Sequence, residues 1–380
     1  MLKQTPLFAA HQKRGGKLIE FGGWEMPVQY SSIVDEHLCV RKAGGIFDIC
    51  HMGEVRLTGS SAGAFLNSIL TNDINKLSIG MGQYSLMCNE KGGAVDDLYV
   101  YRVAETEYLA IINASRIAED VTWMKNALKV YVNRGAVSLE NLSESCGAVA
   151  IQGPRVVEII DQCFPGSSRG GMAVTKASEL KKNQVARFGF QGTSVWVART
   201  GYTGEDGFEV VASALIIEAI WEKVLDLGHA ICLQPAGLGA RDTLRTEMCY
   251  PLYGHELDEE TTPIEAGIGF FVALDKGEFT GRAVLAEQKS AGVKKKAVAF
   301  RMAEKSAPPR PGYPLWSPGA EAACIGKVVS GTQSPSLNVG IGIGYVPTEF
   351  AVVGSRIEVE IRGKRFAAEI VTKPIYRKPA

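Results

Sequence analysis

The stretch "RIEVEIRGKRFAAEIV", residues 356–371, is the clearest hairpin pattern in the chain. Ile357, Val359 and Ile361 alternate with charged residues, as they do in a strand that buries one face. An Arg-Gly-Lys turn follows, and a second strand-like segment comes after it. This segment therefore predicts antiparallel strands near the C-terminal end of the chain.

A change in composition marks where these strands begin. The lysine-rich stretch 287–296 leads into an apolar segment, and the residues after the proline-rich stretch 307–314 have the pattern of short strands and turns. We therefore expect residues 285–380 to form a separate small β-barrel or sandwich domain.

Helix and strand patterns alternate irregularly in the preceding residues. Three stretches have helical character, and the clearest, 213–230, places Leu215, Ile216 and Trp221 on one apolar stripe that ends at Gly228. The irregular order favours an α+β fold over a doubly wound sheet. The other expected helices are 116–131 and 154–164, and the expected strands are 54–59, 108–115, 147–153 and 193–200.

Composition and charge argue against several classes of protein. The chain has 380 residues, 46% of them hydrophobic and 22% charged, which suits two or three folded domains. Lys plus Arg and Asp plus Glu each total 41, so we expect no nucleic-acid partner. The longest apolar run, 267–274, is too short to span a bilayer, so we expect no membrane partner. The N-terminal stretch lacks a signal-peptide core, and the eight cysteines are scattered, which predicts reduced thiols and a cytoplasmic location.

Two adjacent carboxylates stand in "GGAVDDLYVYR" (92–102), between a glycine pair that predicts a turn and an apolar, aromatic stretch that predicts a strand. Because strand side chains alternate, Asp96 and Asp97 point to opposite faces, and Asp97 shares its face with Tyr99 and Tyr101. Two interpretations follow. The stretch is either a solvated strand start, with Asp96 capping the turn or facing solvent, or a strand that presents Asp97 and both tyrosines to a cavity.

A second dense stretch is "RTGYTGEDGFEV" (199–210), where three glycines force an irregular loop that leads into a strand near Phe208. Glu205, Asp206 and Glu209 offer hydrogen-bond acceptors there. The stretch is equally compatible with a binding loop and with a plain turn that carries solvated acids.

A third stretch, "PAGLGARDTLRTEM" (235–248), has Arg241 and Arg245 four residues apart at the entry to an expected helix. This spacing puts both guanidinium groups on one helix face, where they could bind an anion or a planar acceptor. The alternative is a surface helix with an ion pair between Asp242 and Arg245.

The stretch "FDICHMGEV" (47–55) places Asp48, Cys50 and His51 within four residues. The other histidines of the chain lie in unrelated contexts, so these residues lack the partner cluster that a metal site needs. We expect no metal, and a structural or pocket-wall role for the three side chains.

Taken together, these stretches resemble the aminomethyltransferase family, the T-proteins of the glycine cleavage system. The resemblance rests on seven motifs in order between about residues 5 and 377, namely 5–30, 47–55, 82–102, 199–210, 235–247, 251–267 and 330–337. It implies a three-domain cloverleaf around a central folate cavity, with a C-terminal β-barrel at 285–380. In this scheme residues 1–284 form the folate-binding body, whose two intertwined lobes contain roughly 1–50 with 146–250 and 51–145 with 251–284.

The resemblance also implies a reaction. The one carbon of an aminomethyl group on the lipoyl arm of the H-protein passes to tetrahydrofolate, ammonia is released, and 5,10-methylenetetrahydrofolate forms. Asp97 matches the catalytic carboxylate, and Glu209 and Arg241 match the residues that bind the pterin edge. The remaining matches to folate-lining or cavity-mouth positions are Met52, Tyr84, Tyr101, Asn113, Tyr202, Tyr376 and Arg377.

Two other functions remain compatible with the residues. One is a tetrahydrofolate-dependent demethylase of the same fold that takes its carbon from a sulfonium or an N-methylated amine. The other is a folate-binding accessory protein of iron–sulphur assembly without transferase activity. The presence of both "GGAVDDL" and "GYTGEDGFE" disfavours the accessory protein.

Overall fold

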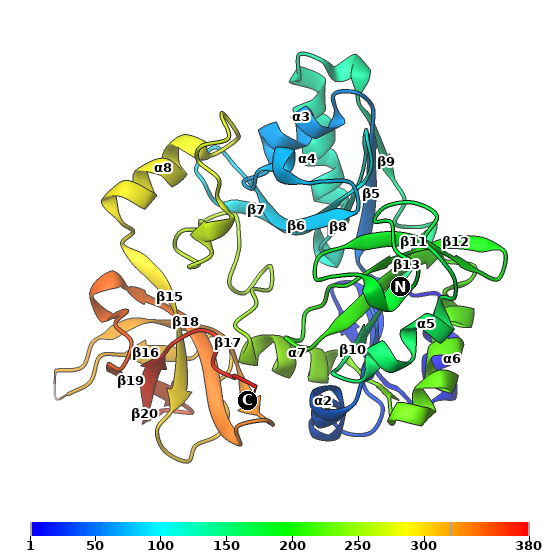
Figure 1. Ribbon diagram of the computed structural model, residues 1–380. Coiled ribbons are helices and arrows are strands. Elements are labelled where there is room, and N and C mark those ends of the chain that lie inside the picture. The colour runs from blue at the N-terminus through cyan, green and yellow to red at the C-terminus, as the bar shows by residue number, and fades with distance from the viewer. Residues whose placement is uncertain (1, 320, 379–380) are drawn as a thin grey trace. The chain divides into compact units, whose positions relative to one another are not determined.

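Helices and strands alternate irregularly along the chain and form an α+β fold, as the computed structural model shows for residues 2–319 and 321–378 (Figure 1). Contacts divide the chain into two units. The first contains Met1–Met87 and Asp96–Arg241, and the second contains Cys88–Val95 and Asp242–Ala380. The division of residues 1–284 into two lobes stays a prediction.

One sheet of the first unit has six strands in the order β11-β12-β13-β10-β4-β14. Its neighbours pair antiparallel except β14, which runs parallel to β4. The core beside it contains the fully buried Trp221 of α6 (Ile217–Gly228). The strands are β4 (Gly45–Asp48), β10 (Cys146–Gln152), β11 (Val185–Phe190), β12 (Thr193–Ala198), β13 (Gly207–Ser213) and β14 (Gln234–Pro235).

A second sheet of five strands has the order β6-β7-β8-β5-β9, and α3 (Ala62–Ile69) and α4 (Ile117–Val130) cover one of its faces (Figure 1). On the opposite face, Tyr101 and Leu109 pack against Val185 and Ala198 of the six-stranded sheet. The two sheets of the first unit therefore meet along this face. The strands are β5 (Gly53–Thr58), β6 (Met81–Cys88), β7 (Ala94–Ala104), β8 (Glu107–Ile112) and β9 (Ser138–Asn141).

A glycine pair makes the turn before β7. Gly92 has a φ of 81°, and a Cβ on Gly93 would lie 1.9 Å from the carbonyl oxygen of Glu259. Asn89 Oδ1 accepts hydrogen bonds from the backbone N–H groups of Lys91 and Gly93. The turn therefore depends on the absence of side chains at both glycines.

The rest of the first unit is a small three-stranded sheet, in the order β1-β3-β2, and helices that pack around the larger sheets. Its elements are β1 (Lys3–Gln4), β2 (Lys17–Phe21), β3 (Trp24–Gln29), α1 (Phe8–Lys13), α2 (Ile33–Lys42) and α5 (Ile160–Cys163), together with α7 (Leu238–Glu247), which continues into the second unit.

The second unit contains a closed barrel in the order β15-β18-β17-β16-β19-β20, which confirms the predicted C-terminal β-domain (Figure 1). The hairpin turns at Arg362 and Gly363, whose φ values of 52° and 76° match the two-residue turn that antiparallel strands favour. The barrel core includes Phe300, which is fully buried. The elements are β15 (Lys295–Met302), β16 (Pro314–Trp316), β17 (Cys324–Ser334), β18 (Val339–Pro347), β19 (Arg356–Ile361) and β20 (Lys364–Val371), preceded by α8 (Arg282–Ala291).

Two helix predictions need correction. Leu215 is 94% exposed because α6 begins only at Ile217, after a turn. The stretch 154–164 forms a short 3₁₀ turn and the single-turn helix α5 in place of one longer helix. In both cases the apolar spacing continued beyond the residues that have helical backbone.

Within the described residues, no helix combines the length and the apolar character needed to cross a membrane. All eight cysteines lie in this part of the chain and carry free thiols. The cytoplasmic location stays a prediction.

Candidate functional site

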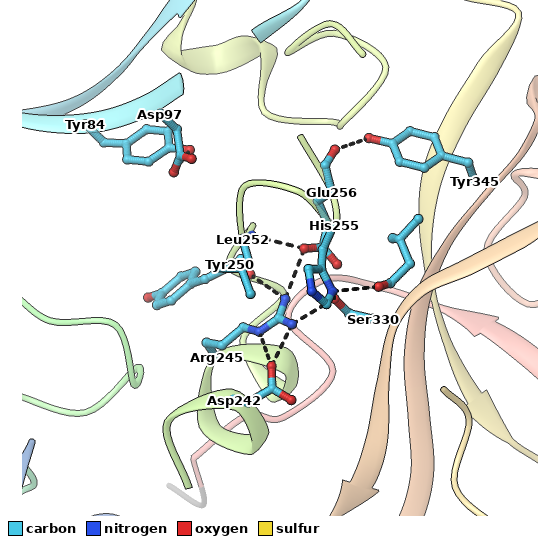
Figure 2. A network of polar contacts seen from close by, with 11 residues as sticks. Tyr84, Asp97, Asp242, Arg245, Tyr250, Leu252, His255, Glu256, Ser330 and Tyr345 are labelled. Carbon is cyan, nitrogen blue, oxygen red and sulfur yellow. Dashed lines mark hydrogen bonds and ion pairs between the residues drawn. The ribbon is translucent and has the colours of Figure 1, made fainter. Parts of the chain in front are cut away.

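Asp97 lies on β7 and is held by side chains from the two neighbouring strand segments. Tyr84 of β6 donates its hydroxyl hydrogen to Asp97 Oδ2 at 2.9 Å, and its ring points toward the carboxyl group (Figure 2). Asn113, which follows β8, donates from Nδ2 to Asp97 Oδ1 at 3.0 Å. Both oxygens of the carboxyl group therefore have fixed partners.

The surroundings of Asp97 favour its neutral form more than water does. Burial raises the pKa of Asp97, and the nearby Asp96 carboxylate adds to this effect, so that the pKa is about 7. The hydrogen bonds from Tyr84 and Asn113 act in the opposite direction. Burial and the Asp97 charge raise the pKa of Tyr84 well above its usual value, so Tyr84 remains a donor at neutral pH. Asp97 can consequently take up and release a proton near neutral pH.

Asp96 corrects one sequence-based expectation, because it neither caps the turn nor faces solvent. Its side chain is fully buried beneath α4. Asn113 donates to Asp96 from its backbone N at 3.0 Å and from Nδ2 at 2.9 Å. The two aspartates therefore point in different directions, as strand geometry requires, yet both contact the same amide group.

A cavity in the first unit brings four of the predicted site residues together: Met52, Tyr101, Glu209 and Arg241. Its apolar walls come from both large sheets. The other lining residues are Ile49, Leu109, Ile111, Ala148, Val185, Trp196, Ala198 and Val211. The cavity is therefore an apolar space that contains one carboxylate and one guanidinium group.

Glu209 enters the cavity from β13 and is oriented by a hydrogen-bonded chain. Thr200 Oγ1 donates to Glu209 Oε2 at 2.7 Å, and the hydroxyl of Tyr101 lies 3.0 Å from the same Thr200 oxygen. The ring of Tyr101 packs against Tyr99, with 4.9 Å between the ring centroids. The strand thus directs Tyr101 toward the cavity. The second interpretation of residues 92–102 also placed Asp97 and Tyr99 there, but neither of them lines this cavity.

Arg241 enters the cavity from α7, and its guanidinium group lies over the ring of Tyr202, 4.7 Å from the centroid. Its Nη1 is buried and has no hydrogen-bond partner among the described residues. Burial lowers the pKa of Arg241, while Glu209 and Tyr202 act in the opposite direction. Tyr202 is also among the groups that raise the pKa of Tyr84, after burial and Asp97.

The other acids of the 199–210 loop have structural roles. Glu205 accepts a hydrogen bond from Arg41 at 2.9 Å, and both side chains are buried. Asp206 pairs with Arg199 through both carboxylate oxygens. These ion pairs hold the loop that carries Tyr202, so the solvated-acid interpretation is wrong for this loop.

Arg245 does not act with Arg241. It is buried in the second unit, where it pairs with Asp242 at 2.7 Å and Glu256 at 3.0 Å and donates to Ser330 (Figure 2). The predicted pair of Asp242 and Arg245 is confirmed, but the expected surface helix is wrong at Arg245, whose side chain is 2% exposed. The hypothesis of two arginines on one anion is also wrong, because Arg245 is already bound to Asp242, Glu256 and Ser330.

Asp48 and His51 also have structural surroundings. Asp48 accepts hydrogen bonds from the Thr5 hydroxyl at 2.7 Å and the backbone N of Cys50 at 2.8 Å, and its Oδ2 lies 2.9 Å from His11 Nε2. Burial lowers the pKa of His51 to about 4, so its imidazole is neutral at neutral pH. Within the described residues, no group of three or more His, Cys, Asp or Glu side chains could hold a metal ion.

The roles of Tyr376 and Arg377 stay predictions. Both belong to the second unit, where the backbone N of Tyr376 donates to the carbonyl oxygen of Glu247 at 3.0 Å. Arg377 is exposed, and its Nη2 lies 3.4 Å from Thr372 Oγ1.

Sequence reasoning missed two residues next to the site. Thr200 bridges Tyr101 and Glu209, and no sequence pattern indicated it. Asp120 lies on α4 beside Asp96. A signal for Asp120 existed, because it is four residues before the buried Met124 and so shares the apolar face of its helix.

Comparisons with known proteins give a consistent result over the whole chain. A family model described as the GCVT N-terminal domain matches residues 7–276, and one described as the glycine cleavage T-protein C-terminal barrel domain matches residues 295–377. The chain is 43% identical to aminomethyltransferases of a Geobacillus strain and of Bacillus subtilis, with 100% of each chain covered. The crystal structure of the glycine cleavage system aminomethyltransferase T from Bartonella henselae superposes with a TM-score of 0.89 at 31% identity, covering 99% of this chain and 98% of that one.

Proposed function

Because the chain belongs to the glycine cleavage T-protein family, the aminomethyltransferases, we propose that Asp97 is the carboxyl group that moves the proton in its reaction. The enzyme transfers the methylene carbon of an aminomethyl group to tetrahydrofolate, releases ammonia and forms 5,10-methylenetetrahydrofolate. The observation that carries the proposal is the fixed position of the Asp97 carboxyl group between the donors Tyr84 and Asn113.

The cavity offers groups that fit the pterin ring of tetrahydrofolate. One edge of that ring presents N–H donors beside a carbonyl acceptor. Glu209 binds Thr200 through Oε2, which leaves Oε1 to accept from such donors, and Arg241 has a buried Nη1 without a partner. We assign Glu209 and Arg241 to this edge, because an unpaired buried donor is costly unless a ligand satisfies it.

Aromatic and apolar side chains complete the proposed folate pocket. Tyr101 and Met52 line the cavity, and Tyr202 supports the guanidinium group of Arg241 from one side. Such walls exclude water and hold a flat ring in one orientation. Much of the rate increase would then come from positioning, since two bound reactants replace a bimolecular encounter.

Asp97 acts through its protonation state. Tetrahydrofolate, when bound, supplies the two nitrogen atoms that receive the carbon, and a proton must move as the second of these bonds forms. A carboxyl group with a pKa near the working pH accepts and returns a proton efficiently. Tyr84 and Asn113 keep its two oxygens in place, so the group is oriented before substrate arrives.

We also propose that the aminomethyl donor is the lipoyl arm of the glycine cleavage H-protein. The family membership supports this donor. The demethylase alternative gains no support from the comparisons, in which relatives that match over the full length are named aminomethyltransferases.

A binding experiment tests the folate assignment without turnover. Tetrahydrofolate affinity is measured by calorimetry for the wild type, Glu209→Gln and Arg241→Gln, with Glu119→Gln and Arg301→Gln as exposed controls. Each site variant should bind about 10- to 100-fold more weakly, the usual effect of removing a hydrogen bond to a charged group. Wild-type affinity in both site variants would contradict the assignment.

A further inference from the structure

Asp97 is connected through Asn113 to two other acids, Asp96 and Asp120, that the proposed reaction does not use. Asn113 Nδ2 lies 2.9 Å from Asp96 Oδ1 and 3.0 Å from both Asp97 Oδ1 and the Asp97 carbonyl oxygen. One amide group therefore holds both carboxylates. Because the same nitrogen binds an oxygen of each, the two carboxyl groups are no more than about 6 Å apart, where like charges interact strongly.

Asp120 approaches Asp96 from α4, on the far side of β7 from the cavity. The two carboxyl groups face each other closely enough to form a hydrogen bond once one of them carries a proton. Asp120 is fully buried, and no N–H or O–H group among the described residues donates to either of its oxygens. A hydrogen bond between two carboxyl groups needs a proton, and Asp120 is the one that lacks other donors.

The charged groups around Asp96 and Asp120 also favour a proton on Asp120. Arg116 Nε lies 3.9 Å from Asp120 Oδ1, within ion-pair range but beyond hydrogen-bond distance, and Glu119 is also on this helix. Burial and the Asp96 carboxylate raise the pKa of Asp120 more than Arg116 lowers it. Burial raises the pKa of Asp96, but Asp120 and two hydrogen bonds from Asn113 act in the opposite direction, so Asp96 has donors for its ionised form that Asp120 lacks.

We propose that Asp96 and Asp120 share one proton, which Asp120 holds, and that the resulting Asp96 charge and its bond to Asn113 position Asp97 and set the pH at which Asp97 takes up a proton. Asp96 and Asp120 are thus positioning residues. The inference rests on the proposed role of Asp97, since it explains how the chain adjusts that carboxyl group.

Among the described residues, three side chains contribute most to the titration of Asp97. They are Tyr84 from β6, Asp96 from β7 itself and Asn113 after β8. Tyr84 and Asn113 donate hydrogen bonds that favour the charged form of Asp97, so Asp96 is the group whose charge opposes it. Removing the Asp96 charge should therefore lower the pH at which Asp97 titrates.

The test is a pH titration of Asp97 by NMR, on full-length enzyme labelled at the aspartate carboxyl carbons. The Asp97 signal is assigned by its loss in Asp97→Asn. In Asp96→Asn the midpoint of Asp97 should fall by about one to two pH units, and the acidic limb of kcat/KM should move with it. An unchanged midpoint, with activity lowered equally at every pH, would overturn the proposal, because a merely structural role has that effect.

Asp120→Asn tests the shared proton and keeps the shape of the side chain. An amide donates to Asp96 as a protonated carboxyl group does, so the Asp97 midpoint should stay within about 0.3 units of the wild type. A downward shift similar to that of Asp96→Asn would mean that Asp120 is ionised, and would overturn this part. Glu119→Gln, an exposed acid next to Asp120, is the control for charge removal on α4.

The NMR readout separates this inference from the proposed function. If Asp97→Asn retains turnover, the catalytic role of Asp97 fails, yet the Asp97 midpoint in Asp96→Asn still reports whether Asp96 controls it. If Asp97→Asn abolishes turnover while the Asp97 midpoint does not respond to Asp96→Asn, only the positioning pair fails.

Discussion

Glu54 on β5 should make the stability of the protein depend on pH in a predictable direction. Its side chain is fully buried, and neither carboxyl oxygen has a hydrogen-bond partner among the described residues. Burial raises the pKa of Glu54 from 4.5 to about 8. Glu54 is therefore neutral in the folded protein at neutral pH, whereas it is ionised in the unfolded chain.

The sign follows from the two pKa values. Below pH 4.5 both states hold the proton, and Glu54 causes no loss of stability. As the pH rises from 4.5 to about 8 the unfolded chain releases the proton first, so folding becomes progressively less favourable. At about 1.4 kcal/mol per unit, the loss across this window is at most about 5 kcal/mol.

Glu54→Gln removes the ionisation and keeps a similar shape, so it should remove this loss. We expect the difference in thermal unfolding midpoint, variant minus wild type, to increase by about 10 °C between pH 5 and pH 8. This estimate uses the usual change of about 2–4 °C in the midpoint per kcal/mol of stability for a unit of this size. Glu144→Gln, an exposed acid, is the control and should show no such increase. A difference for Glu54→Gln that stays constant across the pH range would refute the reasoning.

Three further substitutions test parts of the site and its support. Tyr84→Phe removes a hydrogen-bond donor to the Asp97 carboxylate and should raise the pH at which Asp97 titrates by up to about one unit. The acidic limb of the pH profile of kcat/KM should shift by the same amount, and an unchanged limb would contradict this expectation. Gly201→Ala would place a Cβ 1.8 Å from Gln152 Oε1, so it should displace the loop that carries Tyr202. Tetrahydrofolate affinity, measured by calorimetry, should fall at least about 10-fold, and unchanged affinity would show that the loop adapts. Arg245→Met leaves the buried Glu256 without its counter-charge and should lower the free energy of unfolding by about 3–5 kcal/mol in urea. A loss below about 1 kcal/mol would argue against a buried ion pair.

Local patterns predicted the parts of the structure that depend on neighbouring residues. Alternation along 356–371 predicted the hairpin of β19 and β20, and alternation along β7 predicted that Tyr101 and Asp97 differ in direction from Asp96. The resemblance then supplied Glu209 and Arg241, which the structure places in one cavity.

The features that sequence patterns missed depend on residues far apart in the chain. Glu205 resembles a solvated loop acid until its partner Arg41, which lies more than a hundred residues earlier, is known. Asp96 resembles a turn residue because nothing near it in sequence shows that α4 covers it with Asp120. Long-range packing therefore decided which acids are structural and which can act in chemistry.

The most direct test of the account is turnover of aminomethylated H-protein with tetrahydrofolate by the wild type and by Asp97→Asn, with ammonia and 5,10-methylenetetrahydrofolate both measured. We expect stoichiometric formation of both products by the wild type and a loss of about 100-fold or more in the variant, the usual contribution of a positioned acid–base group. Turnover at the wild-type rate in Asp97→Asn would contradict the central role of this carboxyl group.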